Sequence, residues 1–249
     1  MPDLDWNSRF WGADYAWTGR GEEWSEPWGS SEAQWFGSLL PRIHRFLPCQ
    51  RILEIAPGFG RWTRFLLPEC KQFIGIDLAA KCVTACQQTF TNYAHASFYQ
   101  NDGLTLEVAG AEKFNFIFSF DSLVHAEADV VAAYIPQAIS LLTDTGAAFI
   151  HHSNYANSGA KENRGARSES VTAQLVARLV QEAGGHIIVQ EVINWCAAEP
   201  TDCLTLFKRG PEPSQSVLLT NLNFMHEATI IRQLHNIYCK QLDGIAKRG

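Results

Sequence analysis

The chain has 249 residues, a formal net charge of -6, 46% hydrophobic residues and 18% charged residues. This length fits one α/β domain with extensions or two small domains, and the composition favours a well-packed globule. The acidic balance disfavours a protein that holds nucleic acid through its phosphates, and no apolar run approaches the roughly 18 residues of a transmembrane helix.

Residues 1–47 predict an ordered aromatic arm. They contain six of the eight tryptophans, interleaved with glycines and acidic residues and without a clean helical or strand period. A disordered tail would be poor in aromatic residues. Residues 32–47 predict an amphipathic helix that Pro41 limits or kinks. The tryptophan rings either pad the edge of the core or form a lid over a ligand, and the sequence leaves both open.

Residues 48–209 predict a core in which short apolar strands alternate with helices. The expected strands span residues 51–56, 72–77, 96–100, 115–120, 146–152, 186–195 and 203–208, and the expected helices lie within 61–67, 78–90, 128–142 and 171–183. This α/β alternation is typical of a mainly parallel sheet, here of seven strands, with helices on both faces. The last two strands have no helix between them, which suggests a hairpin on one edge of the sheet.

Residues 210–249 predict a linker and a C-terminal helix. Residues 210–222 begin with Gly-Pro-Glu-Pro-Ser, which is typical of a linker. Residues 224–245 carry apolar side chains on or near one helical face. This helix could cap the domain or pair with a second copy of the chain as a homodimer.

The sharpest motif is Leu-Glu-Ile-Ala-Pro-Gly-Phe-Gly-Arg at residues 53–61, where a strand leads into a Gly-x-Gly turn and a helix. Gly58 and Gly60 permit a tight turn and let the backbone approach a ligand. A nicotinamide dinucleotide site would require a third small residue where Thr63 stands. Glu54 would repel a pyrophosphate at the helix N-terminus, so it suits a ligand that carries an ammonium and a sulfonium group.

Acidic residues follow the next two expected strands. Asp77, which precedes Leu78, lies 19 positions after the first glycine of the turn. At this spacing a carboxylate accepts hydrogen bonds from ribose hydroxyls, and the alternative is a helix N-cap. Asn101, Asp102 and Gly103 follow the third strand. Asp102 could accept from an adenine amino group or form an Asp-Gly turn, and the two roles are compatible.

Ser119 and Asp121 stand at the end of the fourth expected strand. Ligands of open α/β sheets bind outside the carboxyl ends of the strands, near the topological switch point. We therefore expect these residues at the same site as the three preceding motifs.

With these motifs in order, residues 52–154 resemble the S-adenosylmethionine-binding half of class I methyltransferases. The resemblance implies a Rossmann-like sheet with one antiparallel edge strand, and S-adenosyl-L-methionine as the cofactor. It assigns Glu54, Ala56, Gly58 and Gly60 to the first motif, Asp77 to the ribose, Asp102 to the adenine, and Asp121 to the position beside the methionine moiety and the acceptor.

More narrowly, the chain resembles methyltransferases of polysaccharide and sugar-modifying pathways. The motifs behind this are Gly-Glu-Glu-Trp-Ser at 21–25, Trp-Gly at 28–29, Asp-Ser-Leu-Val-His at 121–125, His-His-Ser-Asn at 151–154, and the later Gln190, Trp195, Asp202 and Cys203. This resemblance implies O-methylation of a sugar or glycan-like small molecule. The acidic charge and the lack of a long apolar run predict neither nucleic acid nor a membrane as partner.

Histidines at strand ends offer a general base. A sugar hydroxyl is a poor nucleophile, and a general base typically contributes ~10²–10⁴-fold. His125 follows the fourth strand, and His151 and His152 end the fifth. Neighbours in a strand point to opposite faces, so only one of that pair can readily face the acceptor. The candidate catalytic set is His125, His152 and Asp121.

Two further ligand sets are open. Asp121, one of the paired histidines and either Asn154 or Glu127 could hold Mg²⁺, which the resemblance allows because some sugar methyltransferases use it. The sequence does not establish such ligands. Arg164 and Arg167, in the polar loop after the fifth strand, could grip a phosphate or carboxylate on the acceptor, or the loop could simply be solvated.

Other functions remain as alternatives. The acceptor could be the nitrogen, carboxyl or phenol of another natural product. An NAD-dependent oxidoreductase shares the general fold, and Thr63 argues against it. A non-enzymatic cofactor-binding subunit would be expected to carry a damaged motif, and none is visible. Residues 119–122 lack the Pro-Pro-aromatic element of base-modifying methyltransferases.

The cysteines and the N-terminus indicate a cytoplasmic protein. The seven cysteines include no C-x-x-C pair, and their odd number fits reduced thiols. The acidic N-terminus lacks the apolar region of a signal peptide.

Overall fold

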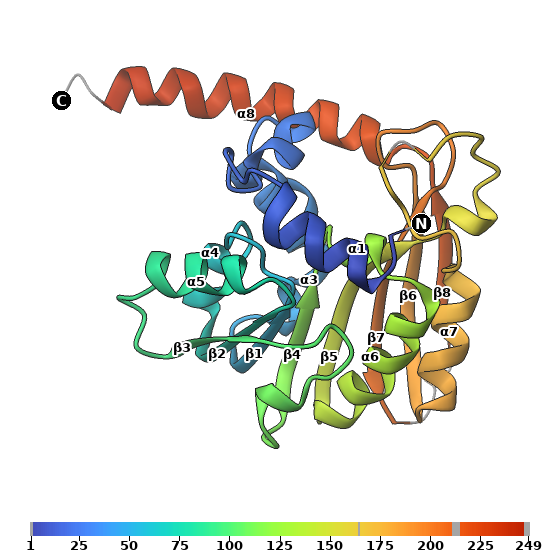
Figure 1. Cartoon of the computed structure of the whole chain (residues 1–249). Coiled ribbons are helices and arrows are strands. Elements are labelled where there is room, and N and C mark those ends of the chain that lie inside the picture. Colours follow the sequence, from blue (N-terminus) through green and yellow to red (C-terminus); the bar gives the residue numbers. More distant parts are fainter. Residues whose placement is uncertain (1, 164, 211–214, 247–249) are drawn as a thin grey trace.

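The computed structural model describes residues 2–163, 165–210 and 215–246, with side chains described as far as Tyr238. In this part of the chain one eight-stranded sheet has the order β3-β2-β1-β4-β5-β7-β6-β8 (Figure 1). The strands are β1 (Cys49–Ile55), β2 (Cys70–Asp77), β3 (Ala96–Gln100), β4 (Phe114–Ser119), β5 (Leu142–Ser153), β6 (Gly185–Ile193), β7 (Asp202–Arg209) and β8 (Val217–Asn221). β7 is antiparallel to β5 and β6, and the other neighbouring strands are parallel.

The sheet confirms the mainly parallel architecture and corrects one end of it. The prediction of seven strands with an antiparallel edge strand is wrong in two respects. The antiparallel strand β7 lies between β5 and β6, inside the sheet, and β8 forms the edge. β8 falls in residues 210–222, where the sequence predicts a linker. Its side chains are mostly exposed, so it carries no alternation of core-facing residues that the sequence could reveal.

Helices cover both faces of the sheet, as predicted. On one face α6 (Ala128–Leu141) and α7 (Ala173–Glu182) pack against the apolar side chains of β4 and β5. On the other face lie α4 (Thr63–Leu66), α5 (Ala80–Thr89), the N-terminal helical segment and the start of α8 (Phe224–Ala246). Phe224 and Ala228 are buried there, so α8 caps the domain at its beginning and then extends beyond it (Figure 1).

The N-terminal residues form a chain of short helices, and their tryptophans fall into two groups, one in the core and one at a pocket. The helices are α1 (Leu4–Arg9), η1 (Phe10–Asp14), η2 (Glu22–Trp28), α2 (Ser31–Gln34), η3 (Trp35–Leu39), α3 (Leu40–Ile43) and η4 (His44–Phe46). Trp28 and Trp35 are buried in the core of the α8 face. Trp11, Trp17 and Trp24 instead contact one another above the carboxyl ends of the strands.

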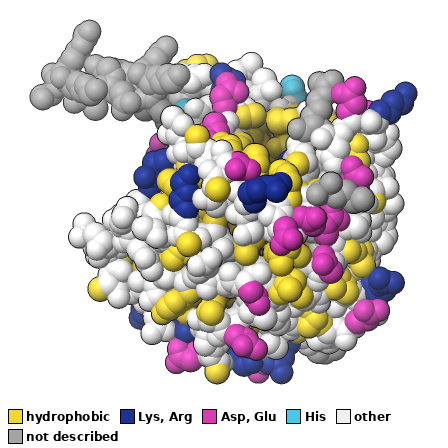
Figure 2. Space-filling view, in the orientation of Figure 1, with side chains coloured by type: hydrophobic (Ala, Val, Ile, Leu, Met, Phe, Trp, Pro, Cys, Tyr) yellow, Lys and Arg dark blue, Asp and Glu magenta, His cyan; other side chains and the backbone are white. Residues whose placement is uncertain are grey.

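The remaining short helices are η5 (Leu67–Glu69), η6 (Glu107–Ala109), η7 (Leu123–His125) and η8 (Tyr155–Asn157). No helix in the described ranges is long and apolar enough to cross a membrane. Figure 2 shows Lys and Arg interspersed with Asp and Glu on the visible face, without a continuous basic stripe. The six cysteines that the structure describes are free thiols.

Candidate functional site

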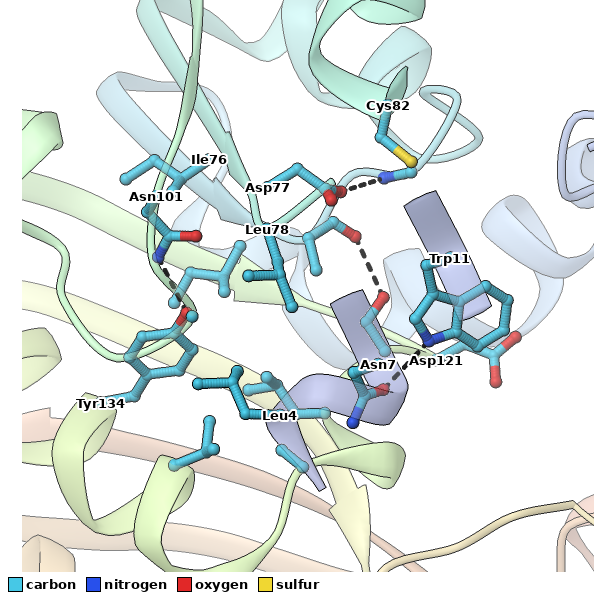
Figure 3. Close-up of a pocket in the computed structure, with 18 of the residues that line it drawn as sticks. Leu4, Asn7, Trp11, Ile76, Asp77, Leu78, Cys82, Asn101, Asp121 and Tyr134 are labelled. Carbon is cyan, nitrogen blue, oxygen red and sulfur yellow. Dashed lines mark hydrogen bonds between the residues drawn. The ribbon is translucent and has the colours of Figure 1, made fainter. Parts of the chain in front are cut away.

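A pocket lies where β1, β2 and β4 end and where the chain leaves β3 (Figure 3). Its empty space, including the solvent in its open mouth, is about 750 Å³. One wall comes from these strand ends, and Tyr134 of α6 adds to it. The opposite wall comes from the N-terminal arm, through Leu4, Asn7, Trp11, Trp17 and Trp24.

The turn after β1 brings backbone close to the arm. Ala56, Gly58 and Gly60 all have positive φ, at 57°, 59° and 86°. A Cβ atom on Gly58 would lie 2.7 Å from the ring of Trp17, so only glycine fits between the turn and the arm. Ala56 and Gly58 line the pocket, whereas a Cβ on Gly60 would point at Phe90 in the core. Gly60 therefore allows the turn to pack against the core and does not itself line the pocket.

Glu54 lies beneath this turn rather than in the pocket. Its side chain is buried and accepts a hydrogen bond from Thr63 Oγ1 at 2.5 Å. Burial raises the pKa of Glu54 to about 8, against the opposing effect of the Thr63 hydroxyl. Thr63, which the sequence offers only as an argument against a dinucleotide, is thus the partner of the motif's acidic residue.

Asp77 connects the glycine turn with the start of α5. Its Oδ2 accepts from the Gly58 amide at 3.0 Å, and its Oδ1 accepts from the Ala79 amide at 2.8 Å. The side chain lines the pocket, as does Leu78. Burial raises the pKa of Asp77 to about 6, although both amides favour the carboxylate. The N-cap of α5 is Ala79, so the N-cap alternative for Asp77 is wrong, and its side chain faces the pocket.

The segment after β3 presents Asn101 and Gly103 to the pocket, and Asp102 faces solvent. Asp102 Oδ1 accepts from the amides of Leu104 and Thr105 at 2.9 and 2.7 Å, and these bonds lower its pKa. The predicted Asp-Gly turn is therefore present, and the predicted contact of Asp102 with adenine does not fit this placement. Asn101 Nδ2 donates to the Tyr134 hydroxyl at 2.9 Å, while its buried Oδ1 has no hydrogen-bond partner in the described part of the chain.

Asp121 follows β4 in a left-handed conformation, with φ of 60°. Its carboxylate accepts from Arg61 Nη2 at 2.7 Å, and both side chains are nearly inaccessible to solvent. Arg61 is stacked between Trp24 of the arm and Trp62, at 5.2 and 4.5 Å from the ring centroids. Ser119 Oγ donates to the carbonyl of Ile55 and joins β4 to β1. Asp121 thus connects the strand ends with the arm.

The three candidate histidines occupy different environments. His125 lies under the arm, 5.3 Å from the Trp11 ring, and its Nδ1 donates to the Ala166 carbonyl at 2.8 Å. Burial and the Arg167 charge lower the pKa of His125 to about 4. His152 faces the α6 side of the sheet, and its ring nitrogens bond to the Ser153 carbonyl and the Thr205 hydroxyl. The predicted catalytic role of His152 therefore does not fit its placement.

His151 is the member of the pair that reaches the end of β4. Its ring packs on Phe120, with centroids 4.7 Å apart, and its Nδ1 accepts from the Asp121 amide at 3.2 Å. The alternation of side chains along β5 puts His151 on the face of Phe149 and puts His152 on the opposite face.

The residues considered for Mg²⁺ do not converge. In the described part of the chain no three His, Cys, Asp or Glu side chains gather as a metal-binding group. Asn154 bonds to Pro200 and Ala173, and Glu127 bonds to Ser168. Arg167, considered for the acceptor, instead pairs with Asp202 at 2.9 Å. Arg164 lies outside the described residues.

Comparison with known proteins agrees with this geometry. Residues 52–146 match a family model described as a methyltransferase domain, and no curated protein matches the chain by sequence. Similar solved structures include an S-adenosylmethionine-dependent methyltransferase from Clostridium acetobutylicum ATCC 824, with a TM-score of 0.59 and 14% identity over 80% of this chain and 97% of that one.

Two further structures share the fold. The N-methyltransferase NodS from Bradyrhizobium japonicum WM9 has a TM-score of 0.57 and 18% identity over 72% of this chain and 96% of that one. Magnesium protoporphyrin IX methyltransferase (ChlM) from Synechocystis PCC 6803, with bound SAH, has a TM-score of 0.56 and 12% identity over 82% of this chain and 98% of that one. The chain therefore has the class I methyltransferase fold, and the match of residues 52–146 to a methyltransferase domain supports an enzyme.

Proposed function

We propose that the chain is an S-adenosylmethionine-dependent O-methyltransferase that methylates a hydroxyl of a sugar or glycan-like small molecule. One observation carries the proposal: four residues at the carboxyl ends of four different strands line a single pocket, namely Gly58, Asp77, Asn101 and Asp121. The methyltransferase-domain match spans all four positions.

The polar groups of the pocket suit the parts of S-adenosylmethionine. The Asp77 carboxylate can accept from ribose hydroxyls. The buried Oδ1 of Asn101, without a partner in the described residues, suits a donor such as the adenine amino group. A Cβ on Gly103 would lie 2.4 Å from Leu4, so glycine keeps this wall open. The bound cofactor would supply a methyl group activated on a sulfonium.

The acceptor side supports transfer to a hydroxyl. An in-line displacement requires that acceptor and donor be held in a site that excludes water, and Trp11, Trp17 and Trp24 cover the pocket. We assign His125 as the general base. Its Nδ1 donates to Ala166, so the lone pair of Nε2 can take the hydroxyl proton. Its ring lies behind Trp11, which lines the pocket, and its pKa of about 4 keeps the ring neutral at pH 7 while making it a weaker base than a free imidazole. No metal step is included, because the proposed metal ligands bond elsewhere.

Transfer to nitrogen, carboxyl or phenol is the alternative outcome, since the fold does not decide the acceptor. NodS, which shares the fold, is named an N-methyltransferase. The oxidoreductase alternative meets its obstacle in Thr63, which stands where the turn of a dinucleotide site requires a third small residue.

Calorimetric titration with S-adenosylmethionine and with NAD⁺ tests the proposal. We expect saturable binding of S-adenosylmethionine only. Asp77→Asn should weaken it at least about tenfold, the usual effect of losing a hydrogen bond to a charged group. Asp102→Asn is the matched control, since Asp102 follows the next strand but faces away from the pocket. Binding of NAD⁺ instead, or no binding of S-adenosylmethionine, would refute the proposal.

A screen of sugars, amines, carboxylic acids and phenols with the bound cofactor then identifies the acceptor. Methylation of an amine and of no sugar would replace the O-methyltransferase assignment. The homodimer and the cytoplasmic location stay predictions. Light scattering on the purified protein measures the first, for which Ile230, Leu234 and Ile237 of α8 offer exposed apolar side chains.

A further inference from the structure

Three buried side chains form a hydrogen-bonded line that ends on the backbone of Asp121. Arg167 donates to Asp202 through Nε at 3.1 Å and Nη2 at 2.9 Å. Asp202 Oδ2 lies 3.0 Å from His151 Nε2, and the Asp121 amide lies 3.2 Å from His151 Nδ1. The side chains of His151 and Asp202 are 0% exposed. The line therefore connects the loop after β5, the start of β7 and the end of β4.

The partners of His151 determine its tautomer. A backbone amide can only donate, so Nδ1 must accept and carries no proton. Asp202 is ionised: burial alone would raise its pKa, but the Arg167 guanidinium and the His151 N–H outweigh burial and hold this pKa well below its usual range. Nε2 must therefore carry the proton and donate it to Asp202. Both ring nitrogens are used, and neither is free to take a proton from an acceptor.

The hydrogen bond from the Asp121 amide to His151 is made by a residue with a strained backbone conformation. Asp121 is a non-glycine residue in the left-handed region, a conformation that costs about 1–2 kcal/mol. Its carboxylate direction depends on this φ, and that direction puts Asp121 in the main pocket and in the small neighbouring cavity lined by Arg61. Arg61 holds the carboxylate, and His151 holds the amide.

We propose that His151, oriented by Asp202 and Arg167, is a positioning residue that fixes the backbone of Asp121 and thereby aims the Asp121 carboxylate at the bound cofactor. The inference rests on the proposed function, in which the pocket binds S-adenosylmethionine. His151 itself does not line the pocket.

Two substitutions of His151 distinguish its contact with the Asp121 amide from its contact with Asp202. In His151→Asn the amide oxygen takes the place of Nδ1 and can still accept from the Asp121 N–H. In His151→Gln the side-chain end takes the place of Nε2 and can still meet Asp202, but the acceptor for Asp121 is lost. We expect the affinity of His151→Asn for S-adenosylmethionine to stay within about threefold of that of the wild-type protein. We expect His151→Gln to bind it about tenfold more weakly, as if one contact of the Asp121 carboxylate with the cofactor were lost.

A double-mutant cycle links the effect to Asp121. Asp121→Ala should lower the affinity by a factor similar to that of His151→Gln, and the double variant should be no weaker than either single one. The inference would be overturned if His151→Asn and His151→Gln lost affinity equally, or if only His151→Asn lost it. It would also be overturned if the losses in the double variant were additive, or if Asp121→Ala left the affinity unchanged. If the wild-type protein does not bind S-adenosylmethionine, it is the proposed function that fails.

A measurement on the unmodified protein remains informative if a variant fails to fold. The ¹⁵N chemical shifts of the His151 ring report which nitrogen carries the proton. The inference requires the Nε2–H tautomer at neutral pH. The Nδ1–H tautomer would exclude the bond to the Asp121 amide and would overturn it.

Discussion

Removal of the Arg61 guanidinium should destabilise the protein more than removal of any solvent-exposed cation. Arg61 and Asp121 are 5% and 7% exposed and 2.7 Å apart, so Arg61→Met leaves an unpaired carboxylate in a nearly dry environment. Breaking one side of such a pair costs about 3–5 kcal/mol. For a chain of this size we expect a fall in Tm of about 6–20 °C at pH 7. Thermal unfolding followed by circular dichroism measures it.

Two variants control this measurement. Arg64 is an equally sized cation within α4, three residues after Arg61. Its side chain is 45% exposed, and that of its partner Glu22 is 41% exposed. Arg64→Met should cost no more than about 1 kcal/mol. Adding Asp121→Asn to Arg61→Met removes the stranded charge and should restore at least about half of the loss. If Arg61→Met costs no more than Arg64→Met, or if Asp121→Asn restores nothing, the pair is not a desolvated ion pair and the reasoning fails.

Two further predictions concern the pocket and the turn behind it. The pKa of Asp77 is raised to about 6, and ribose hydroxyls donate more strongly to the ionised form than to the neutral acid. Affinity for S-adenosylmethionine should therefore rise as the pH increases from 5 to 7, and calorimetry should find this rise abolished in Asp77→Asn. Gly60→Ala would place a Cβ 2.4 Å from Phe90 and should cost about 2–4 kcal/mol, from the strain of φ +86° and overpacking. Gly184→Ala, at φ +77° with no atom within 4 Å, should cost about 1 kcal/mol in denaturant titrations, and equal costs would contradict the clash.

Most elements could be predicted from the sequence because each carries its own local signal. β3 forms over residues 96–100, as predicted, and α6 and α8 match their predicted ranges closely. β8 gave no such signal, since it is short, exposed and preceded by Gly-Pro-Glu-Pro. The interior place of β7 depends on its pairing with β5 and β6. The local periodicity of a segment predicts a strand but does not predict with which distant strand it pairs.

The same distinction applies to the site. Asp77 could be located because strand, turn and acid follow one another at fixed spacing, and it lines the pocket. Between Asn101 and Asp102 the sequence favoured the acid, but the Asx turn uses the carboxylate of Asp102 and leaves the amide of Asn101 facing inward. For His151 and His152, alternation shows that they face opposite sides, and only the packed sheet shows which side holds Asp121.

Two residues with strained backbone line the pocket, one after each of the adjacent strands β1 and β4. Ala56 after β1 and Asp121 after β4 both lie in the left-handed region, at φ of 57° and 60°, where a side chain costs about 1–2 kcal/mol each. Each is tied down by its neighbours: the Ala56 amide donates to Ile76, the Ala56 carbonyl accepts from Ser122, and the Asp121 amide donates to His151. Such strain persists only where surrounding contacts over-determine it, and it clusters at functional sites. The two turns therefore form a preorganised floor for the pocket, and the hydrogen bonds from His151 to Asp202 and Arg167 connect this floor to β7 and to the loop after β5.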